Sequence, residues 1–441
     1  MATHPAHGDT RLSLWRRVRE FAVPPAMIDT ATARRTTGDW AGACAAAGFD
    51  VDLDLRLLAR AGGRDVVRRI RADLRGLAPD LLRWHLPRVA PDGLLRPGLT
   101  VALARHDVGD SSLWLVARTP PAWADAGQRI SLALWDGTPG EPAARGHPHP
   151  RPSRRFRFDL HRHLWHAGAA GDLRTRSGAD RLPDGEPSPC ATGRWADEAR
   201  IVLRAEGRNS GGVVVRLGGR QRLALHVAAD GTTTTGTGGK DTGALPVLPD
   251  AATWILPDLE LLRAGLIDAD RLHPLVAPAL VPGHVPAARD RSPDPAGQAR
   301  LVECRGARHR IGLVDGVLSP LDHSPDELRR EELLMAFGGP PLPCLRVIDA
   351  AHRRPDCLTG VRERLDHGDI AGALAVVEGL LGPEAVLRDG PLKDELESAA
   401  RRRVDYGLYR AGLAGSRDAP VRTRHRERHD PRLGPRPAGR R

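Results

Sequence analysis

Three blocks of short apolar runs interrupt a sequence with mainly helical patterns, and they limit the folds open to this chain. The first block, residues 99–136, contains the runs Leu-Thr-Val-Ala-Leu-Ala, Leu-Trp-Leu-Val-Ala and Ile-Ser-Leu-Ala-Leu-Trp. The blocks at 213–227 and 300–318 place tight-turn pairs, Gly218-Gly219 and Asp315-Gly316, between their runs. Each block predicts a small antiparallel sheet, so the expected fold class is α+β.

Two segments rich in proline, glycine and arginine, residues 137–155 and 283–298, predict linkers between modules. The 441 residues also exceed the roughly 250 to 300 that one hydrophobic core usually holds. We therefore expect several modules, with helical regions at both ends and small sheets between them. The expected modules are a helical region with a sheet over 1–136, an α+β module over 156–282, and a sheet followed by helical hairpins over 299–414.

Helices are predicted where apolar residues recur every three or four positions. An N-terminal helix should end before Pro24-Pro25, and a capping box at Ser324-Pro325-Asp326-Glu327 predicts a helix that stops at Gly338-Gly339. Further helices are predicted at 25–37, 39–47, 54–61, 64–77, 156–174 and 195–206.

One short motif occurs twice, as Gly38-Asp39-Trp40-Ala41-Gly42-Ala43 and as Gly368-Asp369-Ile370-Ala371-Gly372-Ala373. In each copy the first glycine can end one helix and the aspartate can cap the next. The motif resembles the turns of tetratricopeptide-like helix pairs, but two distant copies do not make a solenoid.

Positive charge is concentrated at the C-terminus. Residues 415–441 hold nine arginines and three acidic residues, so they carry +6 of the net charge of +11. Because they also lack apolar periodicity, they predict a disordered basic tail. Lysine occurs only twice among 66 basic residues, so arginine is the default cation here and its abundance alone is weak evidence for phosphate binding.

The sequence favours a reduced, cytoplasmic environment. The five cysteines are odd in number and far apart, which predicts mostly buried thiols rather than disulfides. No stretch approaches the roughly 18 uncharged apolar residues that a membrane span needs, and no secretory signal is visible. We therefore expect a cytoplasmic protein without a membrane partner.

Two groups of side chains are candidates for metal binding. His163 and His166 would share one helical face, with His161 and Asp159 nearby. The spacing of Cys344, His352 and Cys357 fits no zinc pattern, although Cys304 and His309 could join them if folding brings these residues together. Buried free thiols and a basic helix are the simpler interpretations of the two groups.

A candidate catalytic site lies at the start of the capped helix in the third module. Asp315, Asp322, His323 and Glu327 combine carboxylates with a histidine, which can support acid–base chemistry. Any capped helix that follows a hairpin can have the same composition. No loop carries complete catalytic or cofactor-binding features, and no cofactor is predicted.

A candidate nucleic-acid site combines a basic helix with the tail. Helices at 54–61 and 64–77, followed by the strands after Leu99, have the outline of a helix-turn-helix motif with a wing. Its candidate contacts are Arg64, Arg68, Arg69, Arg71 and Arg75, with Arg422, Arg424, Arg426 and Arg428 of the tail as a sequence-independent phosphate binder.

These patterns leave three functional hypotheses. The leading hypothesis is a non-enzymatic interaction or scaffold protein with another protein as its partner, because no complete set of catalytic residues is visible. The alternative is a DNA- or RNA-binding protein that uses the helix 64–77 and the basic tail. A second alternative is an enzyme with a site near Asp322 and His323.

Overall fold

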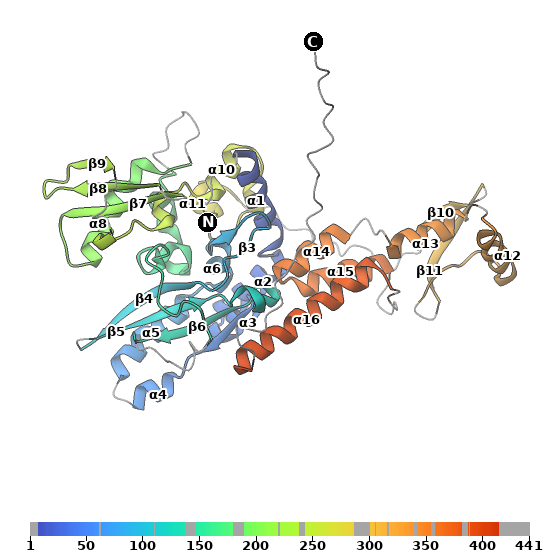
Figure 1. Cartoon of the computed structure of the whole chain (residues 1–441), viewed down its shortest axis with the longest axis horizontal. Coiled ribbons are helices and arrows are strands. Elements are labelled where there is room, and N and C mark those ends of the chain that lie inside the picture. The colour runs from blue at the N-terminus through green and yellow to red at the C-terminus, as the bar shows by residue number, and fades with distance from the viewer. Residues whose placement is uncertain are drawn as a thin grey trace, which may run out of the picture.

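A four-stranded sheet lies in the N-terminal part of the chain in the computed structural model, with strand order β1-β6-β5-β4 (Figure 1). The strands are β1 (Phe49–Asp52), β4 (Thr100–Val108), β5 (Ser111–Arg118) and β6 (Ile130–Trp135). β4, β5 and β6 are antiparallel neighbours, as the first block of apolar runs predicts. β1 joins the edge of β6 in parallel and has too few residues to give a pattern of its own.

Helices cover this sheet and form the rest of the N-terminal region. They are α1 (Gly8–Phe21), α2 (Pro25–Thr36), α3 (Trp40–Ala46), α4 (Leu55–Arg60), α5 (Arg64–Gly76) and α6 (Pro79–His85), and they confirm the helices predicted there. α5 packs against β4 because Val66, Ile70 and Leu74 recur on one buried face. The short strands β2 (Arg88–Val89) and β3 (Leu94–Leu95) follow α6 as a two-stranded sheet.

The segment 156–174 is not the single helix that its composition predicts. It forms three 3-10 turns, η4 (Phe158–Leu160), η5 (Arg162–Leu164) and η6 (Ala167–Asp172), before the short helix α7 (Leu173–Ser177). Part of the backbone also bonds to a distant segment, since the carbonyl of Trp165 accepts a hydrogen bond from the amide of Ala78 at 2.9 Å. The segment still makes local hydrogen bonds, such as that from the Leu164 amide to the His161 carbonyl at 3.0 Å, but as separate 3-10 turns and not as one helix.

The next part contains a three-stranded antiparallel sheet covered by a helix. Its strands are β7 (Gly211–Gly218), β8 (Gln221–Val227) and β9 (Thr233–Thr237), and the first two form the predicted hairpin. α8 (Trp195–Ala205) packs on β7 and β8, in agreement with the helix predicted at 195–206. The remaining elements are η1 (Ala122–Ala124), η2 (Ala126–Gln128), η7 (Thr192–Arg194), α9 (Asp250–Thr253), α10 (Pro257–Arg263), η9 (Ala269–Arg271) and α11 (Ala277–Leu280).

The last part begins with a second three-stranded antiparallel sheet. Its strands are β10 (Arg300–Cys304), β11 (Ala307–Val314) and β12 (Val317–Pro320), as the third block of runs predicts. The predicted cap is present, because Ser324 Oγ accepts from the amide of Glu327 at 3.2 Å. The helices are α12 (Pro325–Ala336), α13 (Pro343–Arg353), α14 (Leu358–His367), α15 (Ile370–Leu381) and α16 (Pro391–Ala411).

The main hydrophobic core crosses the predicted boundary between the first two modules. It runs from Leu14 to Leu280 and joins α1, α5, α6 and the central sheet to Phe158, Trp165 and the helices after residue 255. The sheet of β7 and β8 has a separate core with α8. Independent folding of the predicted modules stays a prediction, but residues 156–173 share a core with the N-terminal region.

None of the helices in the described part of the chain is long and apolar enough to span a membrane. The structure describes residues 8–60, 63–109, 111–137, 146–179, 189–218, 221–237, 243–285, 300–304, 306–314, 317–338, 340, 342–353, 358–381, 387 and 389–413.

Candidate functional site

A groove with a volume of about 410 Å³ lies between the central sheet and the α8/β7–β9 unit. Figure 1 shows β7–β9 and α8 beside β4–β6 in this region. The polar and aromatic side chains that line the groove are Arg105, Trp114, Trp135, Arg151, Arg154, Arg157, Glu206 and Arg208. Five of these eight are arginines and two are tryptophans, so the groove combines positive charge with aromatic surface.

The sheet wall of the groove is a row of side chains across three neighbouring strands. Arg105 of β4 pairs in register with Trp114 of β5, and Trp114 pairs with Trp135 of β6. Directly paired residues project from the same face of a sheet, so the three side chains lie side by side. Both tryptophans are half-buried, which leaves part of each ring facing the groove.

The second wall is formed by residues 151–157. This segment runs beside β4, because the amide of Ser153 donates to the carbonyl of Thr100 at 2.9 Å and Arg157 forms a parallel bridge with Ala102. The Arg157 guanidinium lies 5.6 Å from the Trp114 ring centroid, as does that of Arg105. Trp114 is therefore held by two cation–π contacts.

Only part of the positive charge in the groove is neutralised by described residues. Arg105 pairs with Asp107 at 3.0 Å, and Arg157 pairs with Asp159 at 2.8 Å and Glu206 at 3.0 Å. Burial opposes charge on Arg157, but its hydrogen bonds to both carboxylates outweigh burial and raise its pKa. Arg151, Arg154 and Arg208 are exposed and form no ion pair with any described residue. These three guanidinium groups remain available for an anionic ligand.

The predicted basic helix lies close to one end of this groove. Its candidates Arg64, Arg68, Arg69, Arg71 and Arg75 are all exposed on α5. Arg69 donates to the backbone carbonyl of Asp107 at 2.8 Å, and the carboxylate of the same residue binds Arg105. Arg71 and Arg75 line a second hollow of about 520 Å³ with Trp40 and Arg56. Base-specific contacts from α5 stay a prediction, and the tail arginines lie outside the described residues.

The predicted histidine group has separate partners in the structure. His161 Nε2 lies 3.2 Å from Glu198, and its Nδ1 lies 2.9 Å from the carbonyl of Arg157. His163 lines an internal cavity, whereas His166 lies against Gly76 at the end of α5. The structure therefore does not direct His161, His163 and His166 at one common ion.

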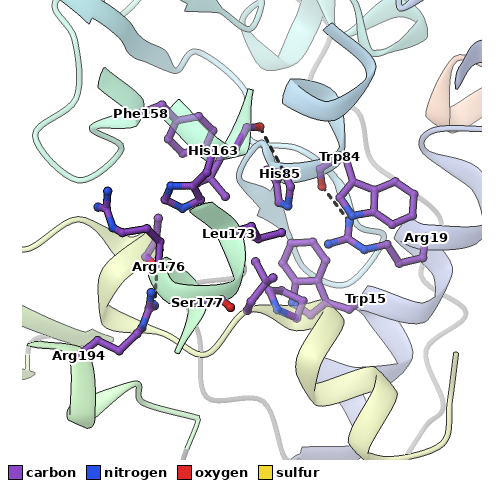
Figure 2. A pocket seen from close by; sticks show the side chains of 14 residues that line it. Trp15, Arg19, Trp84, His85, Phe158, His163, Leu173, Arg176, Ser177 and Arg194 are labelled. Atoms are coloured by element: carbon purple, nitrogen blue, oxygen red, sulfur yellow. Dashed lines mark hydrogen bonds between the residues drawn. The ribbon is translucent and has the colours of Figure 1, made fainter. Parts of the chain in front are cut away.

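The internal cavity is lined by aromatic and basic side chains, as Figure 2 shows for Trp15, Trp84, His85, His163 and Arg194. Its volume of about 20 Å³ has room for about one water molecule. Burial lowers the pKa of His85 to about 3 and also lowers the pKa of His163, so both rings stay neutral near pH 7. The cavity is a polar junction within the main core and is too small for a substrate.

The predicted catalytic residues do not form an open site. His323 is 7% exposed, and its Nδ1 lies 3.3 Å from Glu327. Asp322 instead faces solvent, where hydrogen bonds from Arg310 lower its pKa to about 2. Asp315 lies outside the described residues. The burial of His323 counts against acid–base catalysis at this position.

Sequence analysis did not identify the groove. The apolar runs indicated the strands but not which side chains face the groove, because the alignment of Arg105, Trp114 and Trp135 depends on strand register. Comparisons of the chain with family models, with curated proteins and with solved structures found no match.

Proposed function

We propose that the groove binds single-stranded nucleic acid, within a non-enzymatic cytoplasmic protein. The observation that supports this function is the row of Arg105, Trp114 and Trp135 across three strands, with the exposed arginines Arg151, Arg154 and Arg208 lining the same groove. Half-buried rings on a sheet give bases a surface for stacking, and each stacked base contributes about 1–3 kcal/mol. The guanidinium groups supply phosphate contacts.

The proposal assigns different roles to the two walls. Trp135 contacts bases because it projects from an edge of the row and has no cation–π contact with a described arginine. Arg151, Arg154 and Arg208 contact phosphates and give affinity that falls with salt. The basic tail adds a sequence-independent contribution, so its removal should weaken binding without abolishing it.

Fluorescence anisotropy with labelled single-stranded RNA and DNA tests the proposal. Trp135→Leu should weaken binding about tenfold or more, since one stacking contact is lost. The logarithm of the binding constant falls linearly with the logarithm of the salt concentration, with a slope of about 0.7 per phosphate contact. Arg151→Gln combined with Arg154→Gln should therefore reduce this slope by about 1.4. The matched control is Arg263→Gln with Arg271→Gln, which removes two exposed arginines outside the groove.

Two results would overturn this function. One is loss of all binding when residues 415–441 are removed, which would assign the affinity to the tail. The other is binding that tolerates Trp135→Leu and is displaced equally well by polyglutamate, because this would indicate an acidic peptide site. Binding that survives tail removal and depends on both walls supports the proposal.

Protein interaction, the leading hypothesis from the sequence, remains a second candidate because apolar side chains are exposed on the last turns of α12 and directly after its end. Leu333, Leu334 and Phe337 are 55%, 51% and 89% exposed. Exposed groups of this kind often mark protein contacts. Sedimentation velocity over a concentration series tests self-association through this face, which Phe337→Ser should abolish. A protein that stays monomeric at every concentration would remove this support.

A further inference from the structure

Three potential metal ligands converge in the last third of the chain. Cys304 ends β10, His323 lies in the turn before α12, and Cys344 lies in the first turn of α13. One ligand atom from each of these residues lies within 4.8 Å of the other two. Their exposed fractions are 0%, 7% and 0%, so the cluster is buried. Four cysteines are described as free thiols, among them Cys304 and Cys344, so the cluster is not held by a disulfide.

His309 lies next to this group, in contact with His323. Its Nδ1 lies 2.8 Å from Nε2 of His323. Strand register explains this placement, because His309 of β11 pairs with Val302 of β10, and Cys304 lies two residues after Val302. Side chains two positions apart in a strand share one face. The β10–β11 hairpin therefore presents Cys304 and His309 on the same face, toward α13.

The His323 ring lies between His309 and Glu327. The Nε2 atom of His323 faces His309, whereas its Nδ1 atom lies 3.3 Å from Oε2 of Glu327. Metal-binding histidines commonly donate their second ring N–H to a carboxylate, which fixes the tautomer and the direction of the ring. The Nδ1 atom of His323 is buried and has no hydrogen-bond partner among the described residues, so the ring keeps unused bonding capacity beside the cluster.

The small size of the local core gives an independent reason for a metal. Its buried side chains are Cys304, Ile311, Leu342, Cys344 and Ile348. Two of these five are cysteines, and the further aliphatic side chains packed against them, Val302, Leu345 and Val347, are only partly buried. Small cores of this kind are commonly supported by a disulfide or by a structural metal.

We propose that Cys304, His309, His323 and Cys344 hold one structural zinc ion. Two thiolates and two imidazoles match the ligands that zinc prefers, and four protein ligands complete a tetrahedral site with bonds of about 2.0–2.3 Å. The ion links β10, β11, the turn before α12 and the start of α13, and it stabilises residues 300–353. This inference does not depend on the proposed nucleic-acid groove.

The predicted ligands Cys344 and Cys304 therefore belong to one site, with His309 and His323 in place of His352 and Cys357. The sequence spacing is Cys-x4-His-x13-His-x20-Cys. This spacing lacks the paired short intervals of common zinc motifs, which explains why pattern comparison did not identify the site. Cys357 and the side chain of His352 lie outside the described part of the chain.

Metal analysis of the full-length protein is the first test. Protein purified without chelators should contain about one zinc ion per chain, and Cys304→Ser, Cys344→Ser and His323→Gln should each lose it. Cys190→Ser is the matched control, since Cys190 lies outside the cluster and its loss should leave zinc bound. Folded protein without metal, or with iron or copper in place of zinc, would overturn the proposal.

Two measurements on the unaltered protein avoid variants that fail to fold. Cobalt substituted for zinc should give the visible bands of a tetrahedral ion and a thiolate-to-cobalt charge-transfer band. Alkylation mapped by mass spectrometry should modify Cys304 and Cys344 only after a chelator is added. Hydrogen exchange measured after the same treatment should show lost protection at 300–353 and unchanged protection in β4–β6. An octahedral cobalt spectrum, or equal alkylation with and without chelator, would contradict a zinc site.

Discussion

His367, the last residue of α14, is a buried base surrounded by cations. It is 1% exposed, and neither ring nitrogen has a hydrogen-bond partner among the described residues. Burial, reinforced by the nearby guanidinium groups of Arg88 and Arg83, lowers its pKa to about 3. His85 and His147 are similar, because burial lowers their pKa values to about 3 and about 4.

These shifts determine how stability changes with pH. The unfolded chain binds a proton at each histidine near the ordinary pKa of 6.5, whereas the folded protein does not until about pH 4 or 3. Protons therefore favour the unfolded state below pH 6.5, and the free energy of unfolding falls as the pH falls. Each buried histidine contributes a loss of about 2 kcal/mol between pH 7.5 and pH 5.

His367→Leu should remove one of these contributions. The free energy of unfolding falls between pH 7.5 and pH 5 in both proteins, and we expect this fall to be about 2 kcal/mol smaller in the variant than in the unaltered protein. Urea unfolding at both pH values measures the difference, in which the contributions of other titrating groups cancel. His226→Leu is the matched control for replacing a histidine with leucine, because His226 is exposed. Equal losses in the His367→Leu variant and the unaltered protein would refute the shift.

At the level of elements, the repeated six-residue motif forms the same turn twice. In each copy the aspartate accepts a hydrogen bond from the glycine amide three residues later, at 2.8 Å for Asp39 and 2.9 Å for Asp369. Gly38 and Gly368 both have positive φ, at 82° and 88°. The turn depends on neighbours in the sequence, and for this reason it was predictable.

The two glycines differ in their tertiary surroundings, which gives a matched comparison. A Cβ on Gly38 would meet nothing within 4 Å, whereas one on Gly368 would lie 2.0 Å from the carbonyl oxygen of Gly127. Gly38→Ala should therefore cost about 1–2 kcal/mol for the backbone conformation alone. Gly368→Ala should cost at least about 2 kcal/mol more, since backbone must move. Urea unfolding of both variants measures the loss of unfolding free energy. Equal losses would show that the backbone at Gly127 moves aside without a measurable loss of stability.

Elements that depend on distant partners were less predictable. The capped helix α12 and the hairpins follow from turn and capping residues, so the sequence indicated their positions. The segment 156–174 differs from the prediction because it folds into separate 3-10 turns whose backbone also bonds to Ala78, just before α6. β1 was missed because its four residues become a strand only by pairing with β6.

At the level of the whole molecule, the C-terminal helix α16 returns to the N-terminal sheet. Arg410 donates to both carboxylate oxygens of Asp52, with Nη1 at 2.6 Å from Oδ2, and Tyr406 donates to Asp50. The Trp123 and Tyr409 rings also meet edge to face, with centroids 5.6 Å apart. These contacts join the two ends of the described chain.

Both candidate sites depend on this level of organisation. The groove combines side chains from residue 105 to residue 208, and the cysteine–histidine cluster combines four separate segments between residues 304 and 344. Sequence analysis identified the residue types at several of these positions, including His323 and Cys304. It could not establish their proximity, because proximity follows from register and from packing between elements.

The ion pair between Arg410 and Asp52 should stabilise the docking of α16 without supporting the sheet itself. Arg410→Gln removes a bidentate pair that is partly shielded from water, with side chains 35% and 16% exposed, and should cost about 1–2 kcal/mol. Hydrogen exchange should accelerate in α16 by roughly five- to thirtyfold and stay unchanged in β4–β6. Arg403→Gln, an exposed position on the same helix, is the control.

A double-mutant cycle separates this pair from general effects on the helix. Asp52→Asn should cost a similar amount, and Arg410→Gln combined with Asp52→Asn should cost little more than either single change, because both remove the same interaction. Fully additive costs would show that the two side chains act independently. In that case the docking of α16 would depend on Tyr406, Tyr409 and their apolar contacts instead.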